Sequence, residues 1–322
     1  MSEPLIEIND LYLNYEIYEG TLQVLNGVQL KISKGEKIGL IGESGSGKTT
    51  TVRAITRIQA NNAEITKGSI FYKGKDILNM SEKEMQTIRR KNISMIFQDP
   101  TAALNPVFTV KDQLFDVIKY SNAEKLTKQE TMERAMKALK DVALPDPERI
   151  LENYPIMLSG GMRQRICIAF ALVSATELLI ADEPGTSLDV TIEDQILRLL
   201  GQLVKDRGTS VILISHALGA VKGLVDKVYV MYAGNIIEGA TTEELFSEPL
   251  HPYTVGLFKT VPKITGGGIP EAIKGRIPNY LNPPKGCRFA PRCEHVMPIC
   301  STEMPEFTKV GKGHEVMCYL FK

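Results

Sequence analysis

Residues 42–49, Gly-Glu-Ser-Gly-Ser-Gly-Lys-Thr, form a pattern that suits the binding of phosphate groups. The apolar run 37–41 predicts a strand before it, and the residues after Lys48 predict a helix. Glycines let backbone N–H groups converge on phosphates, Lys48 can reach the β and γ phosphates, and the Thr49 hydroxyl can complete a magnesium shell. The positive end of the helix adds to the stabilisation of the anion. We predict a nucleotide site with Mg²⁺, formed by Gly42, Ser44, Gly45, Ser46, Gly47, Lys48, Thr49 and Thr50.

Two carboxylates follow the apolar run 178–181, at the exit of a predicted buried strand. Asp182 can hold magnesium, directly or through water, and Glu183 can accept a proton from an attacking water. A lone Asp-Glu pair after a strand is more often an ordinary solvated loop. The phosphate-binding pattern upstream favours the catalytic interpretation.

Four of the five cysteines lie in the last 36 residues, separated by five, six and seventeen residues. They are Cys287, Cys293, Cys300 and Cys318. This spacing matches neither the short C-x2-C pairs of zinc sites nor the commonest ferredoxin run, yet four thiolates suffice for a zinc ion or a four-iron cluster. The segment is rich in proline and poor in apolar residues, so a metal could supply its folding energy. His295 and His314 are possible substitute ligands but are expected at the surface, and Cys167 is expected in the core.

Bulk composition excludes several classes of protein. Lysine plus arginine equals aspartate plus glutamate, 38 against 38, so no net field attracts nucleic acid or anionic lipid. The N-terminal residues lack the basic start and apolar stretch of a secretory signal, and no run approaches 18 uncharged apolar residues. We expect a cytosolic chain that does not span a membrane, in which disulfides are not expected.

The elements that must position these residues follow from hydrophobic periodicity. Short, mixed strands are predicted over residues 5–33, and a buried strand over 93–97 ends at Gln98. Apolar residues three and four apart predict helices from about 110 to 172. Strands at 177–181 and 210–214, with a helix between them, predict a parallel sheet covered by helices.

The remainder of the chain reads as a hairpin, a linker and a tail. The hairpin covers residues 227–238 and turns at Ala233-Gly234-Asn235. After Pro262 the composition shifts to glycine and proline, as in Thr265-Gly266-Gly267-Gly268, which predicts a linker to a small C-terminal appendage.

A further segment, Leu158-Ser159-Gly160-Gly161-Met162, resembles the signature sequence of ATP-binding cassette (ABC) ATPases. The order and spacing of the motifs resemble this family over residues 5 to about 240. The resemblance implies an α/β fold, a P-loop NTPase of ABC type with an antiparallel β lip, a mostly parallel core sheet, a helical subdomain at about 100–172 and a small cysteine-rich C-terminal appendage. It divides the chain into an ATPase domain, 1–260, and a C-terminal extension, 261–322.

The same resemblance assigns roles to single residues. Gln98 becomes the Q-loop glutamine, which reaches magnesium or the attacking water and marks where a membrane partner docks. Residues 187–189 become the D-loop, with Asp189 near the nucleotide, and His216 becomes the switch histidine that contacts the γ phosphate. A lone histidine after a strand is otherwise more often structural. The adenine is expected to stack on Tyr15, which ends the predicted strand 11–15, rather than on Tyr18.

Family members are implied to sandwich two ATP molecules between two subunits. The Ser159 hydroxyl and the N–H groups of Gly160 and Gly161 then form an anion site for a γ phosphate supplied across the interface. Hydrolysis would therefore require a dimer. Three departures from the family pattern, at Met162, Gly185 and Ala217, remove no group that handles phosphate.

Several segments resemble the oligopeptide/dipeptide importer ATPases in particular. They are residues 97–100, 104–106, 158–165, 189–191, His251-Pro252-Tyr253-Thr254 and the tail Cys287 to Cys293. The resemblance implies inward transport of di- or oligopeptides at the cytoplasmic face of the cell membrane. Its partners would be a second, distinct ATPase subunit, two transmembrane permease subunits and, indirectly, an external solute-binding protein.

Alternatives remain open at this point. Related ATPases import metal chelates or other small solutes, and a soluble ABC ATPase acting on nucleic acid or ribosomes belongs to a different class. That last class would need a basic face, a coiled-coil insertion or tandem cassettes, and none is visible. For the tail, the resemblance favours a [4Fe-4S] cluster, with zinc, free thiols or a redox or iron sensor as alternatives.

Overall fold

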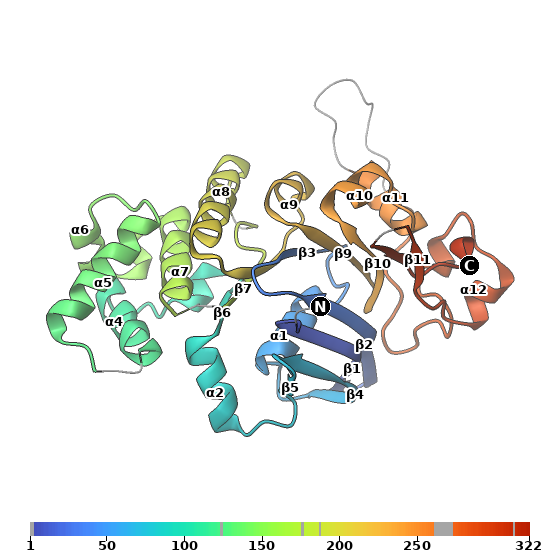
Figure 1. The fold of residues 1–322 in the computed structure, drawn as a ribbon, viewed down its shortest axis with the longest axis horizontal. Helices are drawn as coiled ribbons and strands as arrows, with labels where there is room; N and C mark the ends of the chain where they lie inside the picture. Colours follow the sequence, from blue (N-terminus) through green and yellow to red (C-terminus); the bar gives the residue numbers. More distant parts are fainter. Residues whose placement is uncertain (1–2, 123–124, 175–176, 187, 261–272, 312) are drawn as a thin grey trace. The chain divides into compact units, whose positions relative to one another are not determined.

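The computed structural model describes residues 3–122, 125–174, 177–186, 188–260, 273–311 and 313–322. The chain divides into two compact units (Figure 1). Unit one comprises residues 1–33, 38–79 and 216–322, and unit two comprises 34–37 and 80–215. Within the described ranges, we find no helix with both the length and the apolar character that a membrane crossing requires.

Unit one begins with a four-stranded antiparallel sheet in the order β2-β1-β4-β5. The strands are β1 (Ile6–Ile17), β2 (Gly20–Ile32), β4 (Ala63–Tyr72) and β5 (Lys75–Asp76). Apolar residues alternate along β1 on each side of a register shift between Ile8 and Leu11, so that Ile6, Ile8, Leu11 and Leu13 are fully buried. This sheet confirms the predicted antiparallel lip, but the prediction of short, mixed strands was wrong, because β1 and β2 pair as one long hairpin.

Unit one contains further strands, one of which leads directly into the phosphate-binding segment. Strand β3 (Lys37–Ile41) pairs in parallel with β9 (Lys227–Tyr232), and β9 forms a hairpin with β10 (Asn235–Thr241). Ala233 and Gly234 both have positive φ, as the tight turn of this hairpin requires, which confirms the predicted turn. Helices α1 (Lys48–Thr56), α9 (Leu218–Leu224), α10 (Thr242–Ser247) and α11 (Pro252–Lys259) complete this part.

The C-terminal residues extend that same sheet. Strand β12 (His314–Val316) pairs antiparallel with β10, and β11 (Thr308–Val310) pairs with β12. The remaining elements of the tail are short: η2 (Ala290–Arg292), α12 (Pro298–Thr302) and η3 (Tyr319–Phe321). The sequence predicted an appendage and gave no indication of these two strands. The predicted glycine-rich linker at 265–268 lies outside the described residues.

A buried carboxylate holds the tail to β10. Glu238 is fully buried and accepts hydrogen bonds from the backbone N–H groups of Leu250 and His251, at 2.7 and 2.9 Å. Its side chain also lies 2.7 Å from Nε2 of His314 on β12. The expectation that His314 lies at the surface was therefore wrong, because it packs against this carboxylate. A buried charge needs several such partners to offset its lost hydration.

Unit two contains a parallel sheet and a group of helices. Strand β6 (Ile93–Ile96) pairs with β7 (Leu178–Asp182), and β7 pairs with β8 (Ser210–Ile214). The helices are α2 (Glu82–Lys91), α3 (Pro100–Ala103), α4 (Val110–Ser121), α5 (Lys128–Asp141), α6 (Pro147–Glu152), η1 (Pro155–Met157), α7 (Gly160–Ser174) and α8 (Val190–Arg207). Helix α4 packs on α5, α6 and α7 (Figure 1).

These elements confirm the predicted parallel strands and the helical stretch after residue 110. Helices α2, α4 and α5 each begin with a capping box, in which a Ser or Thr side chain and an acidic residue satisfy the first free N–H groups. Cys167 is buried in α7, as expected, and burial raises the pKa of its thiol to about 12.

The fully buried His251 makes stability depend on pH. Burial lowers the pKa of His251 from its ordinary value of 6.5 to about 3, and its Nδ1 accepts the Tyr253 N–H at 3.0 Å. The unfolded chain binds a proton at this residue below about pH 6.5, while the folded chain does not until near pH 3. This contribution is therefore complete above pH 6.5 and decreases as the pH falls towards 3.

We predict that His251→Asn reduces the loss of stability on acidification. Between pH 7 and pH 5 the buried histidine should cost the wild-type chain about 2 kcal/mol of unfolding free energy. Asparagine keeps an acceptor for the Tyr253 N–H but does not titrate. Urea unfolding of the full chain at both pH values measures the difference, with His295→Asn, at an exposed histidine, as control. An equal loss in wild type and His251→Asn would contradict the prediction.

Candidate nucleotide site and cysteine pocket

The phosphate loop lies between β3 and α1, as predicted. Gly42, Gly45 and Gly47 have φ of 148°, 79° and 105°, which side-chain-bearing residues rarely adopt. A Cβ on Gly42 would lie 2.1 Å from the Met231 carbonyl oxygen on β9, so only glycine fits there. This close approach fixes the backbone from which the N–H groups of the loop project.

Lys48 is 4% exposed, and its side chain binds the backbone of the loop. Its Nζ donates to the carbonyl oxygens of Gly42 and Glu43, at 2.8 and 2.9 Å. The ammonium group is thus held at the loop that should receive phosphates. Thr49 and Thr50 follow in the first turn of α1, where the helix adds its positive end.

Three side chains from the C-terminal part also hold this loop, and sequence reasoning did not assign them. The Tyr253 hydroxyl accepts the Glu43 N–H at 2.8 Å, and the Tyr280 hydroxyl donates to the Gly45 carbonyl at 2.6 Å. Arg292 donates through Nη1 and Nη2 to the two oxygens of the Glu43 carboxylate, at 2.7 and 3.1 Å. Burial raises the pKa of Tyr280 to about 12, so its hydroxyl remains a donor at neutral pH.

In unit two the structure brings Gln98 and Glu183 together. Gln98 Nε2 donates to Glu183 Oε2 at 2.8 Å, and Thr186 Oγ1 lies 3.2 Å from the same oxygen. Asp182 ends β7 and is 1% exposed, and Glu183 has φ of 49°. A left-handed conformation at a non-glycine residue is strained and is found at functional sites more often than elsewhere. The sequence predicted a role for each of Gln98, Asp182 and Glu183, but it did not predict the contact between Gln98 and Glu183.

The predicted signature segment begins helix α7, also in unit two. Ser159 is exposed, and its Oγ accepts the Met162 N–H at 3.3 Å. Cβ atoms on Gly160 and Gly161 would lie 3.1 and 3.2 Å from side-chain carbons of Leu188 and Ile192. The two glycines therefore allow the start of α7 to approach the segment that leads into α8.

The other predicted nucleotide residues lie apart from these contacts. Tyr15 is half-buried in β1, which continues to Ile17, so Tyr15 does not end its strand as expected. His216 is exposed and directly follows β8. Asp189 precedes the first residue of α8, and Ser187 of the predicted D-loop lies outside the described residues.

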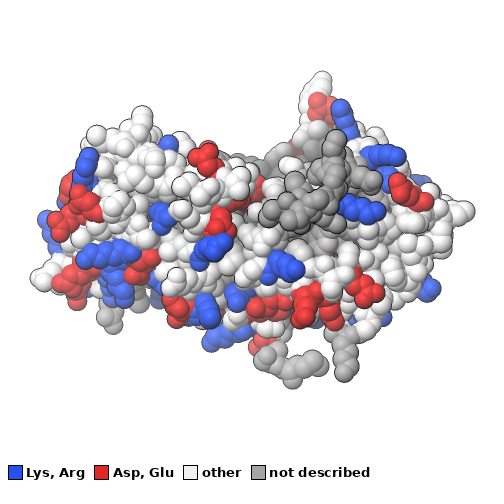
Figure 2. Space-filling model, turned by 90° about the horizontal axis from the view of Figure 1, so that it is seen from above, with Lys and Arg blue, Asp and Glu red and all other residues white. Residues whose placement is uncertain are grey.

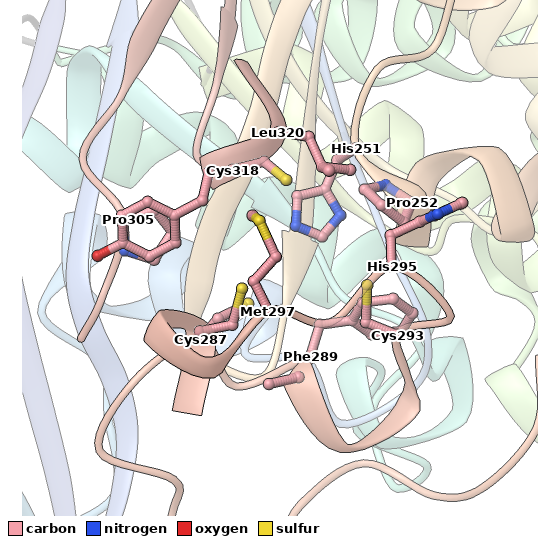
Figure 3. A pocket seen from close by; sticks show the side chains of 13 residues that line it. His251, Pro252, Cys287, Phe289, Cys293, His295, Met297, Pro305, Cys318 and Leu320 are labelled. Carbon is pink, nitrogen blue, oxygen red and sulfur yellow. The ribbon is translucent and has the colours of Figure 1, made fainter. Parts of the chain in front are cut away.

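The four clustered cysteines line one cavity in unit one, together with His251, Phe289, His295 and Met297. Figure 3 shows the thiols of Cys287, Cys293 and Cys318 directed towards a common space beside Met297. Burial raises the pKa of Cys287 to about 11, with a smaller effect of Cys300, and it also raises those of Cys293 and Cys318. Nearby backbone groups oppose this rise in pKa at three of the thiols: Phe289 and Ala290 at Cys287, His295 at Cys293 and Leu320 at Cys318.

The arrangement of these thiols does not match a single-ion site. Across the described part of the chain, no three or more His, Cys, Asp or Glu side chains are grouped as a metal ion requires. The four cysteines thus line one cavity without forming a recognisable set of metal ligands.

Comparison with protein families identifies the chain. The family model described as "ABC transporter" matches residues 25–186, which include the phosphate loop, the signature segment and the carboxylate pair. The chain belongs to the ABC transporter family. A second model, described as "Oligopeptide/dipeptide transporter, C-terminal region", matches residues 237–300 of this ABC protein.

Curated relatives resemble the ABC chain over nearly its full length. "Oligopeptide transport ATP-binding protein OppD" of Bacillus subtilis (strain 168) is 44% identical over 98% of this chain and 88% of the relative. "Dipeptide transport ATP-binding protein DppD" of the same organism is 42% identical over 99% of this chain and 95% of the relative. OppD of Salmonella typhimurium is 42% identical, covering 94% and 89%.

Solved structures match the ABC fold of the chain. A post-hydrolysis dimer of the ATP-binding cassette MJ0796, bound to ADP and Pi, has a TM-score of 0.66 and 25% identity, covering 74% of this chain and 98% of that one. The cbiO1 protein from Clostridium perfringens, part of the transporter complex cbiONQ, has a TM-score of 0.65 and 27% identity, covering 80% and 95%.

One departure from the ABC pattern now has a structural reason. Gly185 stands where a threonine is often found, and a Cβ there would lie 2.6 Å from Cγ of Glu193 on α8. The packing of Glu193 against this backbone thus favours glycine.

We predict that Gly42→Ala destabilises the chain far more than Gly45→Ala. Both residues have positive φ, but an alanine at 42 meets the Met231 carbonyl, whereas nothing lies within 4 Å of a Cβ at 45. Strain alone should cost Gly45→Ala about 1 kcal/mol, and the clash should raise the cost at 42 above about 2 kcal/mol. Denaturant unfolding without nucleotide measures both; similar losses would contradict the close approach.

Proposed function

We propose that this chain is the ATP-hydrolysing subunit of an importer of di- or oligopeptides. The observation that carries the proposal is the combination, in one chain, of an ABC cassette with a C-terminal region of the oligopeptide/dipeptide transporter type. The names of its curated relatives support the same solute class. In this proposal residues 1–260 form the ATPase domain, with a helical subdomain at about 100–172, and residues 261–322 form the extension.

The residues divide the chemistry between them. Lys48 and the loop N–H groups hold the phosphates, and Thr49, Asp182 and Gln98 hold Mg²⁺. Glu183 accepts a proton from the attacking water, while His216 contacts the γ phosphate. In this proposal the adenine stacks on Tyr15, and Asp189 lies near the nucleotide. Ser159, Gly160 and Gly161 bind the γ phosphate across the interface. The strained Glu183 and its contact with Gln98 support this assignment, because hydrolysis requires a positioned base.

Partner subunits are proposed on similar grounds. A second, distinct ABC ATPase would supply the opposing signature segment. Two membrane subunits would dock on unit two, where the segments ending at Phe108 and Met157 expose large apolar side chains. The Val110 N–H donates to the Asn153 carbonyl at 3.0 Å, so these segments lie side by side. Exposed apolar side chains gathered in this way are typical of interaction surfaces. The chain would then be a peripheral protein at the cytoplasmic face of the membrane, supplied by an external solute-binding protein.

The alternative of a nucleic-acid-dependent ATPase has less support. Lys and Arg are mixed with Asp and Glu over the face seen in Figure 2. A nucleic-acid surface would instead present a basic stripe. Import of a metal chelate or another small solute stays as the alternative within the transporter class.

We predict that Glu183→Gln retains ATP binding and abolishes turnover and import. Glutamine keeps the shape of the side chain but cannot accept the proton, so hydrolysis in the assembled transporter should fall at least about a hundredfold. Uptake of a labelled oligopeptide by cells that carry only the variant measures transport. Glu133→Gln, an exposed change of the same kind on α5, is the control. Normal uptake in Glu183→Gln would exclude Glu183 as the base, and solute uptake without any peptide uptake in wild type would favour the chelate alternative.

We further propose that the cysteine cavity holds a [4Fe-4S] cluster. The four thiols line one space, and backbone groups beside three of them lower the thiol pKa, an effect that favours bound thiolates. Cys287, Cys293, Cys300 and Cys318 would hold it, and the bound cluster would supply folding energy to a small segment. Zinc at the same four thiols is the alternative, and the described residues show no preformed group of metal ligands for either.

We predict that the anaerobically purified chain contains iron and inorganic sulfide and absorbs visible light through iron–thiolate charge transfer. Cys318→Ser should lose most of the iron, since it removes one of four ligands. Cys167→Ala, a thiol buried in α7, should keep it. Elemental analysis and a sulfide assay measure both. Zinc alone would make the site a structural clip, and the absence of metal in wild type would reject the cluster.

A further inference from the structure

The extension and the phosphate loop meet through an ion pair that the proposed chemistry does not use. Glu43 is a carboxylate within the eight-residue loop, and its side chain is 30% exposed. Arg292, 4% exposed, pairs with both of its oxygens. Bidentate pairs of this kind combine charge neutralisation with fixed geometry.

The charge of Glu43 matters because of what the loop should bind. A nucleoside triphosphate brings several negative charges to the backbone of residues 42–49, where an uncompensated carboxylate would repel it. Pairing with Arg292 removes that repulsion. It also turns the Glu43 side chain towards the extension, where Arg292 Nη1 lies 3.2 Å from the Tyr232 hydroxyl.

Arg292 belongs to a segment that begins and ends in the cysteine cavity. Cys287 precedes Arg288, and Arg292 precedes Cys293. Arg288 Nη1 donates to the carbonyl oxygens of Ala233 and Gln23, at 2.6 and 3.0 Å. The adjacent Gly234 N–H donates to the Ser46 carbonyl at 2.8 Å. Both arginines between the two cysteines therefore contact the phosphate loop or the turn that supports it.

We propose that the segment Cys287–Cys293 sets the nucleotide affinity of the phosphate loop, with Arg292 as the counter-ion of Glu43, and that the cysteine cavity controls this affinity by positioning the segment. This inference deepens the proposed ATPase function and rests on it. Arg292 and Tyr280 are positioning residues, since they act on the nucleotide through the loop. The control is reciprocal, because any coupling of cavity and nucleotide acts equally in both directions.

The first test separates charge compensation from a merely structural contact. Equilibrium binding of MgATP to the full chain is measured by titration for wild type, Arg292→Gln, Glu43→Gln and the double variant. Arg292→Gln should weaken binding about tenfold, which corresponds to about 1.4 kcal/mol. The double variant should return to within about threefold of wild type, because the repelling carboxylate is gone.

The matching controls come from the C-terminal extension. Arg292→Lys keeps the charge and should lose less than Arg292→Gln, and Arg276→Gln changes an exposed arginine of the extension. If the double variant binds as weakly as Arg292→Gln, the ion pair is structural and the proposal is wrong. Arg292→Gln and the double variant both lack Arg292, so impaired folding would weaken binding in both. The urea midpoints of the two variants, measured without nucleotide, show whether either is impaired in folding.

The second test concerns the cavity. Cys293→Ser should weaken MgATP binding at least about threefold in the wild-type background and have no further effect in Arg292→Gln, because both changes act through one contact. Cys167→Ala should have no effect. A Cys293→Ser variant that binds like wild type, or an effect that adds fully to that of Arg292→Gln, would overturn control by the cavity.

Failure of the proposed function has a different outcome. Lys48→Ala should abolish MgATP binding. If wild type and Lys48→Ala bind equally weakly, the nucleotide site itself is wrong. If wild type binds, Lys48→Ala does not and Arg292→Gln binds like wild type, the nucleotide site is correct and Arg292 does not set its affinity.

Discussion

An anion-binding loop directs its N–H groups inward, and this constraint decides what surrounds it. The carbonyl groups of such a loop point away from the anion and need donors from elsewhere. Lys48 donates to the carbonyl oxygens of Gly42 and Glu43. Tyr280 donates to that of Gly45, and the Gly234 N–H donates to that of Ser46. The loop therefore depends on the β9–β10 turn and on the C-terminal extension as much as on its own sequence.

Glu238 holds the segment that leads into the extension and one of the extension's last strands. This buried carboxylate binds the start of α11 through two N–H groups and β12 through His314. The first contact places Tyr253 against Glu43, and the second continues the sheet with the last strands. Removing one partner of such a group would leave a buried polar atom unsatisfied, at a cost of about 1–3 kcal/mol. The cysteine cavity forms between these two anchored segments.

Local patterns predicted the elements, because each has a short-range cause. The strand before Gly42, the turn at Ala233-Gly234 and the helical stretch after about residue 110 were predicted from periodicity and turn residues. The caps at Thr109 and Thr127, seen in the structure, are local features as well. The contacts of Arg292, Tyr280 and His314 join residues more than seventy positions apart and carry no local pattern. The sequence shows two arginines between Cys287 and Cys293, but no local pattern identifies Glu43 as the acid that Arg292 contacts. Long-range pairing of this kind depends on sheet topology, which sequence spacing alone does not determine.

The contact between Gln98 and Glu183 has a consequence for catalysis in unit two. Two donors, from Gln98 and Thr186, lie at the same carboxylate oxygen, so that oxygen has less capacity to accept a proton from water. A Gln98 side chain drawn away towards magnesium would free this oxygen, and the strained backbone of Glu183 indicates that the surrounding structure fixes the carboxylate direction. In the proposed mechanism, one amide group would then link nucleotide binding to activation of the base. Gln98 follows β6, in the same unit as the exposed apolar segments that we propose as the docking site of the membrane subunits.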